Sequence, residues 1–110
     1  MSQRALFILM LGLTLILGAC TMKFGTDFNP KSFHDWVKRG ETTRSQVIEY
    51  LGTPTSEGSV ILGDGTQLKR MLYYYGDGKL HNMENAKFKM LEVRFDSSNK
   101  VYSFNYSTSE

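Results

Sequence analysis

Two stretches in the second half of the chain show the two-residue period that is typical of a β-strand. This period limits the fold more than any other feature. The stretches are residues 67–75 and 87–95. Successive side chains of a strand point to opposite sides, so each stretch predicts a strand with one buried face. The residues expected on the buried face are Met71, Tyr73 and Tyr75 in the first stretch and Leu91, Val93 and Phe95 in the second. We therefore expect an antiparallel sheet that is covered on one side.

Shorter signals predict the rest of the sheet. Residues 59–62 and 100–106 are rich in apolar and aromatic residues, and each lies next to a turn of Gly, Asp, Ser or Asn, at 63–66 and 96–99. These patterns predict two further strands. Residues 76–86 are rich in glycine and polar side chains, so we expect a loop there, long enough to be mobile or functional.

Two helices are expected before the sheet. Asn29 and Pro30 suit the start of a helix over residues 30–39, where Phe33, Trp36 and Val37 share one face. A second helix is expected over residues 43–51. Its signals are Thr43 and Gln46 as a capping box, Gly52 as a left-handed end and Pro54 as a stop.

This order of elements predicts the fold class. Helices followed by strands that are joined by turns indicate an α+β fold of two layers. We expect two N-terminal helices packed on an antiparallel meander sheet of three to four strands, in one domain over residues 30–107.

The first 19 residues predict an export signal. A short start with a single basic residue, Arg4, precedes an apolar run over residues 5–17, and small residues follow at Gly18 and Ala19. The apolar run is shorter than the roughly 20 residues that cross a bilayer as a helix. We therefore expect a signal peptide over residues 1–19 that is cut between Ala19 and Cys20.

The sequence Leu17-Gly18-Ala19-Cys20 resembles the lipobox of bacterial lipoproteins. The resemblance implies a diacylglyceryl group and an N-linked acyl chain such as palmitate on Cys20, so that the chain is held in the lipid bilayer and residues 20–29 form a lipidated tether. Several acyl chains anchor a protein far more firmly than one. Thr21, where an Asp would imply retention in the inner membrane, implies the outer membrane. The alternative is an ordinary secretory signal in which Cys20 is incidental.

Composition and motifs argue against several functions. The net charge is +2 with no basic stripe, which argues against nucleic-acid binding. One cysteine cannot form an intramolecular disulfide or a thiolate metal site. Asp77, His81 and Glu84 are scattered, and the glycine-rich segments at 63–65 and 76–78 read as turns. We find no catalytic motif, so we expect no enzymatic activity, no metal and no cofactor apart from the acyl groups.

Aromatic residues are the candidates for contact with a protein partner. Two short helices cannot cover all of the aromatic side chains in the strands. We therefore single out Tyr74, Tyr102, Phe104 and Tyr106 as a candidate interface. The alternative is that some of them cover the outer face of the sheet through cross-strand aromatic pairs.

The motifs in order resemble the SmpA/OmlA family, which is also called BamE-like. They are residues 37–40 (VKRG), 43–47 (TRSQV), 51–54 (LGTP), 73–75 (YYY) and 91–96 (LEVRFD), with Val101 after a turn. The resemblance implies a small outer-membrane lipoprotein that faces the periplasm and serves as a scaffold in β-barrel assembly and envelope integrity. The long N-terminal segment of BamE proper has no clear match, and Tyr73 stands where the family usually has Trp. The alternative is therefore an envelope lipoprotein of the same fold with a different protein partner, as a stress-response or inhibitor-like module.

Overall fold

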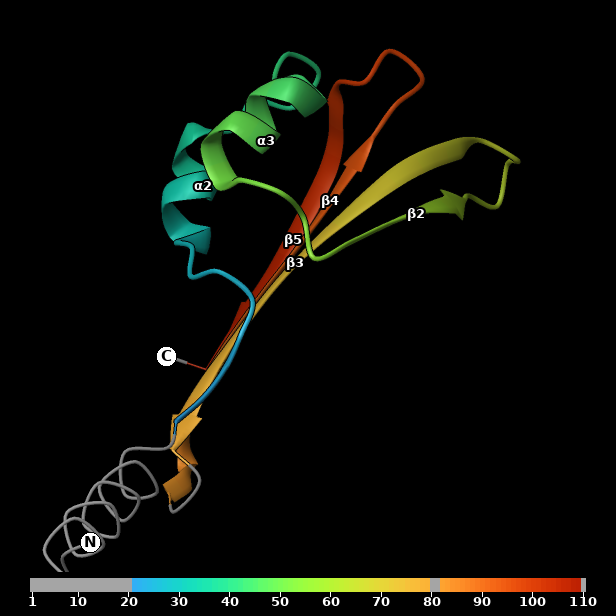
Figure 1. Ribbon diagram of the computed structural model, residues 1–110. Coiled ribbons are helices and arrows are strands. Elements are labelled where there is room, and N and C mark those ends of the chain that lie inside the picture. Colours follow the sequence, from blue (N-terminus) through green and yellow to red (C-terminus); the bar gives the residue numbers. More distant parts are fainter. Residues whose placement is uncertain (1–20, 80–81, 110) are drawn as a thin grey trace, which may run out of the picture.

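The computed structural model describes residues 21–79 and 82–109 and shows an α+β protein with two helices on one face of an antiparallel sheet of five strands (Figure 1). The expected fold class is confirmed in this form, although the sheet has more strands than the three to four expected. In chain order the elements are β1 (Thr21–Phe24), α2 (Pro30–Trp36), α3 (Arg44–Leu51), β2 (Ser56–Ile61), β3 (Gln67–Lys79), β4 (Asn82–Phe95) and β5 (Val101–Thr108).

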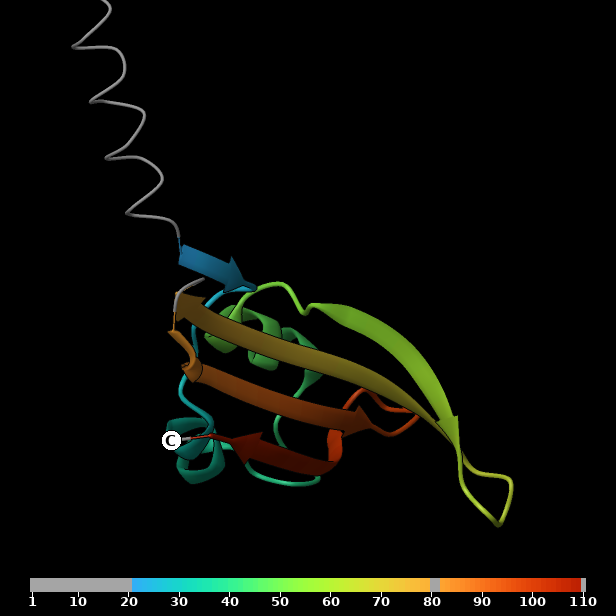
Figure 2. The same ribbon diagram turned by 90° about the horizontal axis from the view of Figure 1, so that it is seen from below.

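Strand β3 organises the sheet. It pairs with β4 along one edge, and β4 pairs in turn with β5. The other edge of β3 is shared, because β2 pairs with its first half and β1 with its last residues (Figure 2). The sheet is therefore not a simple meander, since its first strand in the sequence lies beside its third.

Strand β1 lies where a tether was expected. Thr21 pairs with Lys79 and Phe24 pairs with Gly76. At Gly25 the backbone has φ of +78°, and a Cβ there would lie 2.0 Å from the carbonyl oxygen of Tyr74. Only glycine fits this position, because any side chain would overlap backbone atoms of β3. Residues Thr21–Phe24, which the sequence placed in the tether over residues 20–29, are thus a strand of the sheet.

The expected loop over residues 76–86 is also wrong for most of its length. Residues 76–79 continue β3 and residues 82–86 begin β4, with a register shift between Asp77 and Lys79. The ladder hydrogen bonds need no side chain, so glycine is compatible with the strand. The ring of Phe88 packs over Gly76, since it lies 3.5 Å from the position that a Cβ of Gly76 would occupy. Aromatic side chains that cover a glycine on a neighbouring strand are a known stabilising device.

The helices form largely as expected. The side chain of Asn29 caps α2, but α2 ends at Trp36 rather than Arg39, because Val37 is extended with ψ of 143°. The hydroxyl of Thr42 accepts a hydrogen bond from Lys38 N at 2.8 Å, which holds the chain in its new direction. In α3 the capping box of Thr43 and Gln46 is present.

The core lies between the helices and the odd-numbered residues of β3 and β4. The two predicted sheet faces are confirmed as buried, and Phe33 and Val47 meet them from the helices. The buried cluster is Phe33, Val47, Met71, Tyr73, Leu91, Val93, Phe95 and Val101. The hydroxyl of Tyr73 donates to the carbonyl oxygen of Gly52 at 2.8 Å, which satisfies a carbonyl at the end of α3.

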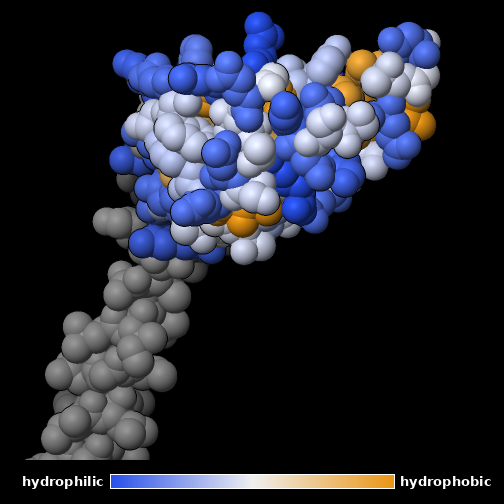
Figure 3. All heavy atoms as spheres, turned by 90° about the horizontal axis from the view of Figure 1, so that it is seen from above, coloured by the Kyte–Doolittle hydropathy of each residue, from blue (hydrophilic) through white to orange (hydrophobic). Residues whose placement is uncertain are grey.

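One end of the sheet projects beyond the helices. The hairpin of β2 and β3 extends past the layer of α2 and α3 (Figure 1). In the space-filling view, hydrophilic residues cover most of the visible surface, and hydrophobic residues show at this projecting end (Figure 3). Ile61, at the end of β2, is 73% exposed.

Candidate functional site

The four aromatic residues that the sequence singled out do not form one surface. Tyr74 lies on the open face of the sheet, opposite the helices, because its neighbours Tyr73 and Tyr75 are buried beneath them. Phe104 and Tyr106 lie on the helix face and pack against the core. Tyr102 is exposed at a register shift between β4 and β5, which moves it out of the alternation of the other two.

The aromatic side chains that do cluster with Tyr74 come from β1 and β4. The rings of Phe24 and Tyr74 meet edge to face with centroids 5.5 Å apart, and the rings of Tyr74 and Phe88 are 6.5 Å apart. Gly76 pairs with Phe24 on one side and with Phe88 on the other. Three strands thus place three rings around a glycine on the open face of the sheet.

Two glycines leave a hollow between these rings. The hollow has a volume of about 210 Å³. We call it the glycine hollow, and its lining is Lys23, Phe24, Tyr74, Gly76, Asp77, Gly78, Ala86 and Phe88. Phe24 is 58% exposed and Phe88 is 43% exposed, so the fold covers both rings only in part. Exposed apolar patches of this kind often mark sites of interaction, and this one can take an apolar group such as a partner's side chain.

The helix face at the same end of the sheet is polar. Lys89 Nζ lies 2.9 Å from Asp27 Oδ1 and 3.1 Å from the carbonyl oxygen of Phe28. The hydrogen bond from Lys89 lowers the pKa of the Asp27 carboxyl. The hydroxyl of Tyr75 donates to Asp77 at 3.0 Å. The two bonds of Lys89 tie the segment that leads from β1 to α2 to strand β4.

A second aromatic surface lies on the helices. The rings of Trp36 and Tyr50 stack in parallel, with centroids 4.2 Å apart and planes 7° from parallel. Both rings pack against Phe33 in the core, yet Trp36 is 36% exposed and Tyr50 is 43% exposed. Trp and Tyr that are partly buried at one end and exposed at the other are the residue types that dominate protein interfaces.

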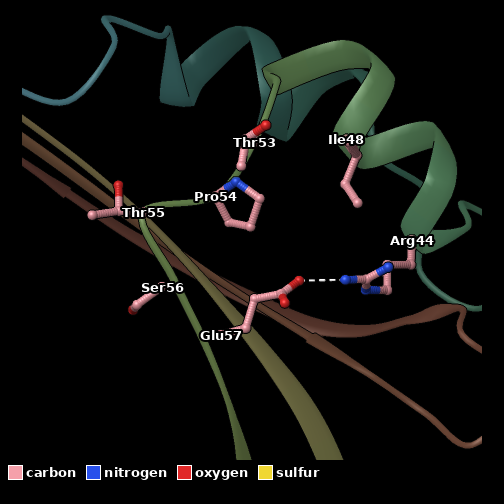
Figure 4. Close-up of a pocket in the computed structure, with 7 residues that line it drawn as sticks. All are labelled: Arg44, Ile48, Thr53, Pro54, Thr55, Ser56 and Glu57. Carbon is pink, nitrogen blue, oxygen red and sulfur yellow. Dashed lines mark hydrogen bonds and ion pairs between the residues drawn. The ribbon is translucent and has the colours of Figure 1, made fainter.

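A cleft of about 430 Å³ lies between α3 and β2 (Figure 4). Arg44 on α3 and Glu57 on β2 form an ion pair across its mouth, and Ile48 and Pro54 supply apolar surface. The hydroxyl of Thr55 accepts from Tyr74 N at 3.0 Å. The cleft therefore holds the Arg44–Glu57 ion pair and a hydrogen bond that ties Thr55 to β3.

The open face of the sheet carries a second paired charge cluster. Glu92 lies between two arginines, with Oε2 3.2 Å from Arg70 Nε and Oε1 2.7 Å from Arg94 Nε. Both carboxylate oxygens have cationic partners, so the group stabilises the pairing of β3 with β4 rather than offering a free acid or base.

Some of the predicted sites lie outside the described residues. Ala19, Cys20 and His81 are among them. Within residues 21–79 and 82–109, no group of three or more His, Cys, Asp or Glu could hold a metal ion. In the same part of the chain, no helix is long and apolar enough to cross a membrane.

Sequence reasoning missed Phe24 and Phe88 as members of a site. Phe88 could have been found from its position opposite Gly76 in the hairpin. The prediction of a loop over residues 76–86 hid this pairing. Phe24 reaches the hollow through pairing between positions more than 50 residues apart, which no local pattern reveals.

Comparison of the chain with protein-family models, with curated proteins and with solved structures found no match.

Proposed function

We propose that this chain is an outer-membrane lipoprotein that faces the periplasm and binds protein partners without catalysing a reaction, as a scaffold or accessory factor in β-barrel assembly and envelope integrity. One observation carries the proposal. Strand β1 begins at Thr21, directly after Cys20, and pairs with the far end of β3. An acyl group on Cys20 would therefore hang from the sheet itself.

This arrangement gives the anchored domain a defined orientation. Because Thr21 pairs with Lys79, the end of the β3–β4 hairpin lies beside the attachment point. The glycine hollow begins within four residues of Cys20 on β1, so it would face a partner close to the membrane surface. The stack of Trp36 and Tyr50 lies on α2 and α3, at the other end of the domain (Figure 1).

The resemblance of the motifs to the SmpA/OmlA, BamE-like family supports barrel assembly as the setting. The two exposed aromatic surfaces support protein binding. The charged residues Arg44 and Glu57 in the cleft between α3 and β2, and Glu92 with its two arginines on the open face, are engaged in ion pairs. The alternative is an envelope lipoprotein of the same fold with a different partner. This alternative is favoured because the long N-terminal segment of BamE proper has no clear match in the chain. Only residues 25–29 separate β1 from α2.

The anchor is tested by the mass of the mature chain. We expect a chain that begins at Cys20 and carries one diacylglyceryl and one acyl group, measured by intact mass spectrometry of membrane extracts. Cys20→Ala should abolish both modifications and release the protein from salt-washed membranes. A Cys20→Ala chain that still sediments with outer membranes would contradict the anchor. Thr26→Ala, an exposed change beyond β1, is the matched control.

The setting is tested by site-specific photocrosslinking from Phe24 and Tyr50 in intact cells, with the exposed Ser97 as the control site. Products that contain barrel-assembly subunits support the scaffold function. Products that contain a single other envelope protein support the alternative. Crosslinking no more efficient than from Ser97 at both aromatic positions would contradict protein binding through these surfaces.

A further inference from the structure

Strand β5 forms one edge of the sheet, and this edge lacks the usual protective features. Figure 2 shows it as the outermost strand on its side of the sheet, and no other described strand pairs with its outer edge. Exposed edges are commonly protected by charged residues or proline, which discourage pairing with another chain. The eight residues of β5 contain neither.

The opposite edge of the sheet differs in each of these respects. It is divided between β1, of four residues, and β2, of six residues. Each of these strands carries a charged side chain, Lys23 in β1 and Glu57 in β2. Short strands and charges are the usual means of blocking edge pairing. The contrast marks β5 as the edge that is open to another strand.

The start of β5 already accepts pairing from within the chain. Gly40 N donates to the carbonyl oxygen of Val101 at 2.8 Å, and Val101 N donates to the carbonyl oxygen of Thr42 at 2.8 Å. Thr43 forms an isolated antiparallel bridge with Lys100. This connection covers only the first residue of β5, so the segment over residues 103–107 has the same edge with nothing from the described chain paired to it.

The sequence of that segment is nearly symmetric about its centre, with an aromatic residue on each side of Asn105 and a serine at each end. It runs Ser103-Phe104-Asn105-Tyr106-Ser107, with Asn105 at its centre. Antiparallel pairing with an identical strand about Asn105 sets Ser opposite Ser and Phe104 opposite Tyr106 of the second copy. Aromatic pairs directly across an antiparallel ladder stabilise it, and no like charges meet. Self-pairing also gives the two-fold symmetry of most homodimers.

Contacts with α2 fix the aromatic side chains of this segment in place. The ring of His34 on α2 lies 5.5 Å from that of Phe104 and 5.9 Å from that of Tyr106. Phe33 contacts Phe104 from the core side, with centroids 5.6 Å apart and planes 87° apart. Rings that are fixed before binding lose little conformational freedom when a partner strand arrives.

From the open edge and its self-complementary sequence, we propose that two copies of this chain associate through antiparallel pairing of their β5 strands about Asn105, which makes one continuous sheet. The occupant of the edge is a second copy because pairing about Asn105 sets serine opposite serine and an aromatic residue opposite an aromatic residue. The proposal does not depend on the lipid anchor or on the partner proposed above.

The first test is self-crosslinking of the full-length chain in intact cells. Directly opposed residues have Cβ atoms about 4.5–5.5 Å apart, close to disulfide range. We expect Asn105→Cys to form a dimer on mild oxidation. Ser59→Cys, on the exposed β2 edge, is the matched control, and the unmodified chain reports any background from Cys20. Dimer formation by Asn105→Cys no greater than that of the control or the unmodified chain overturns the proposal.

The second test measures self-association of the full-length chain in detergent by sedimentation. Asn105→Lys places two like charges opposite each other at the centre of the pair, so we expect roughly a tenfold or greater rise in the dimer dissociation constant. Ser59→Lys should leave it unchanged. Asn105 is exposed, so thermal unfolding by circular dichroism should show an intact fold. A wild-type chain that stays monomeric at every concentration, or an Asn105→Lys chain that dimerises as tightly, refutes the pairing.

Discussion

Lys89 Nζ lies 2.9 Å from the Oδ1 atom of Asp27, which ties β4 to a segment 62 residues earlier in the chain. The lysine side chain is largely buried, whereas that of Asp27 is 60% exposed. The same ammonium group lies 5.9 Å from the centre of the Tyr75 ring. One cation thus connects the segment after β1, the sheet and an aromatic ring.

This pair predicts a dependence of stability on acid. Because the pKa of Asp27 is lowered, its contribution is present above about pH 4 and is lost as the pH falls through the folded value. We expect Asp27→Asn to lower the free energy of unfolding at neutral pH by less than about 1 kcal/mol, since the carboxyl is exposed. The same change should weaken the pH dependence of the free energy of unfolding below about pH 4. Urea unfolding at two pH values measures this. The change Asp35→Asn, an exposed acid on α2, is the control; an equal effect there would contradict the assignment.

The pairing of β1 with β3 requires glycine at position 25. Gly25→Ala requires a methyl group 2.0 Å from a β3 carbonyl oxygen and a positive φ, so we expect β1 to detach from β3. Hydrogen exchange should show lost protection at the alternate amides of β1 that face β3, with protection in β4 retained. Gly63→Ala, which meets no atom within 4 Å, should change neither. Unchanged protection of β1 in Gly25→Ala would show that the backbone adjusts.

Tyr73 predicts a loss of stability in alkali. Burial raises its pKa to about 12, so the folded state holds the proton more tightly than the unfolded state. Its contribution is complete below about pH 10 and is lost between about pH 10 and 12, to a total of roughly 2–3 kcal/mol. Tyr73→Phe should cost about 1 kcal/mol at pH 7 through the lost bond to Gly52 and should reduce the alkaline slope. Tyr102→Phe is exposed and should leave that slope as in the wild type, in denaturant titrations at pH 9 and 11.

The stacked rings of Trp36 and Tyr50 predict energetic coupling. Each ring buries part of its surface against the other at 4.2 Å. We expect the double change Trp36→Ala with Tyr50→Ala to cost less than the sum of the single changes, by about 0.5–1.5 kcal/mol. Chemical denaturation of the four chains gives the cycle. Additive losses would mean that the stack contributes nothing beyond the burial of each ring.

Local patterns in the sequence predicted the helices and the buried faces of β3 and β4, because capping and alternation are decided within a few residues. Thr43 with Gln46, and the alternation around Leu91, are examples. The same reasoning failed at Thr21–Phe24 and Gly76, where the structure depends on pairing between distant segments. A short polar or glycine-rich stretch becomes a strand when a neighbour supplies both the hydrogen bonds and the covering ring. The separation of Tyr102 from Phe104 followed a β-bulge, which shifts the alternation by one position.

The pairing of β1 also determines how a mechanical load would enter the fold. Ladder hydrogen bonds run perpendicular to the strands, so tension applied at Thr21 along β1 acts on all the rungs between β1 and β3 together instead of opening them one after another. The four paired positions from Thr21 to Phe24 would share that force. A domain joined to an anchor through such a paired strand would resist separation under force. It would also rotate less about the attachment point than a domain on a flexible linker.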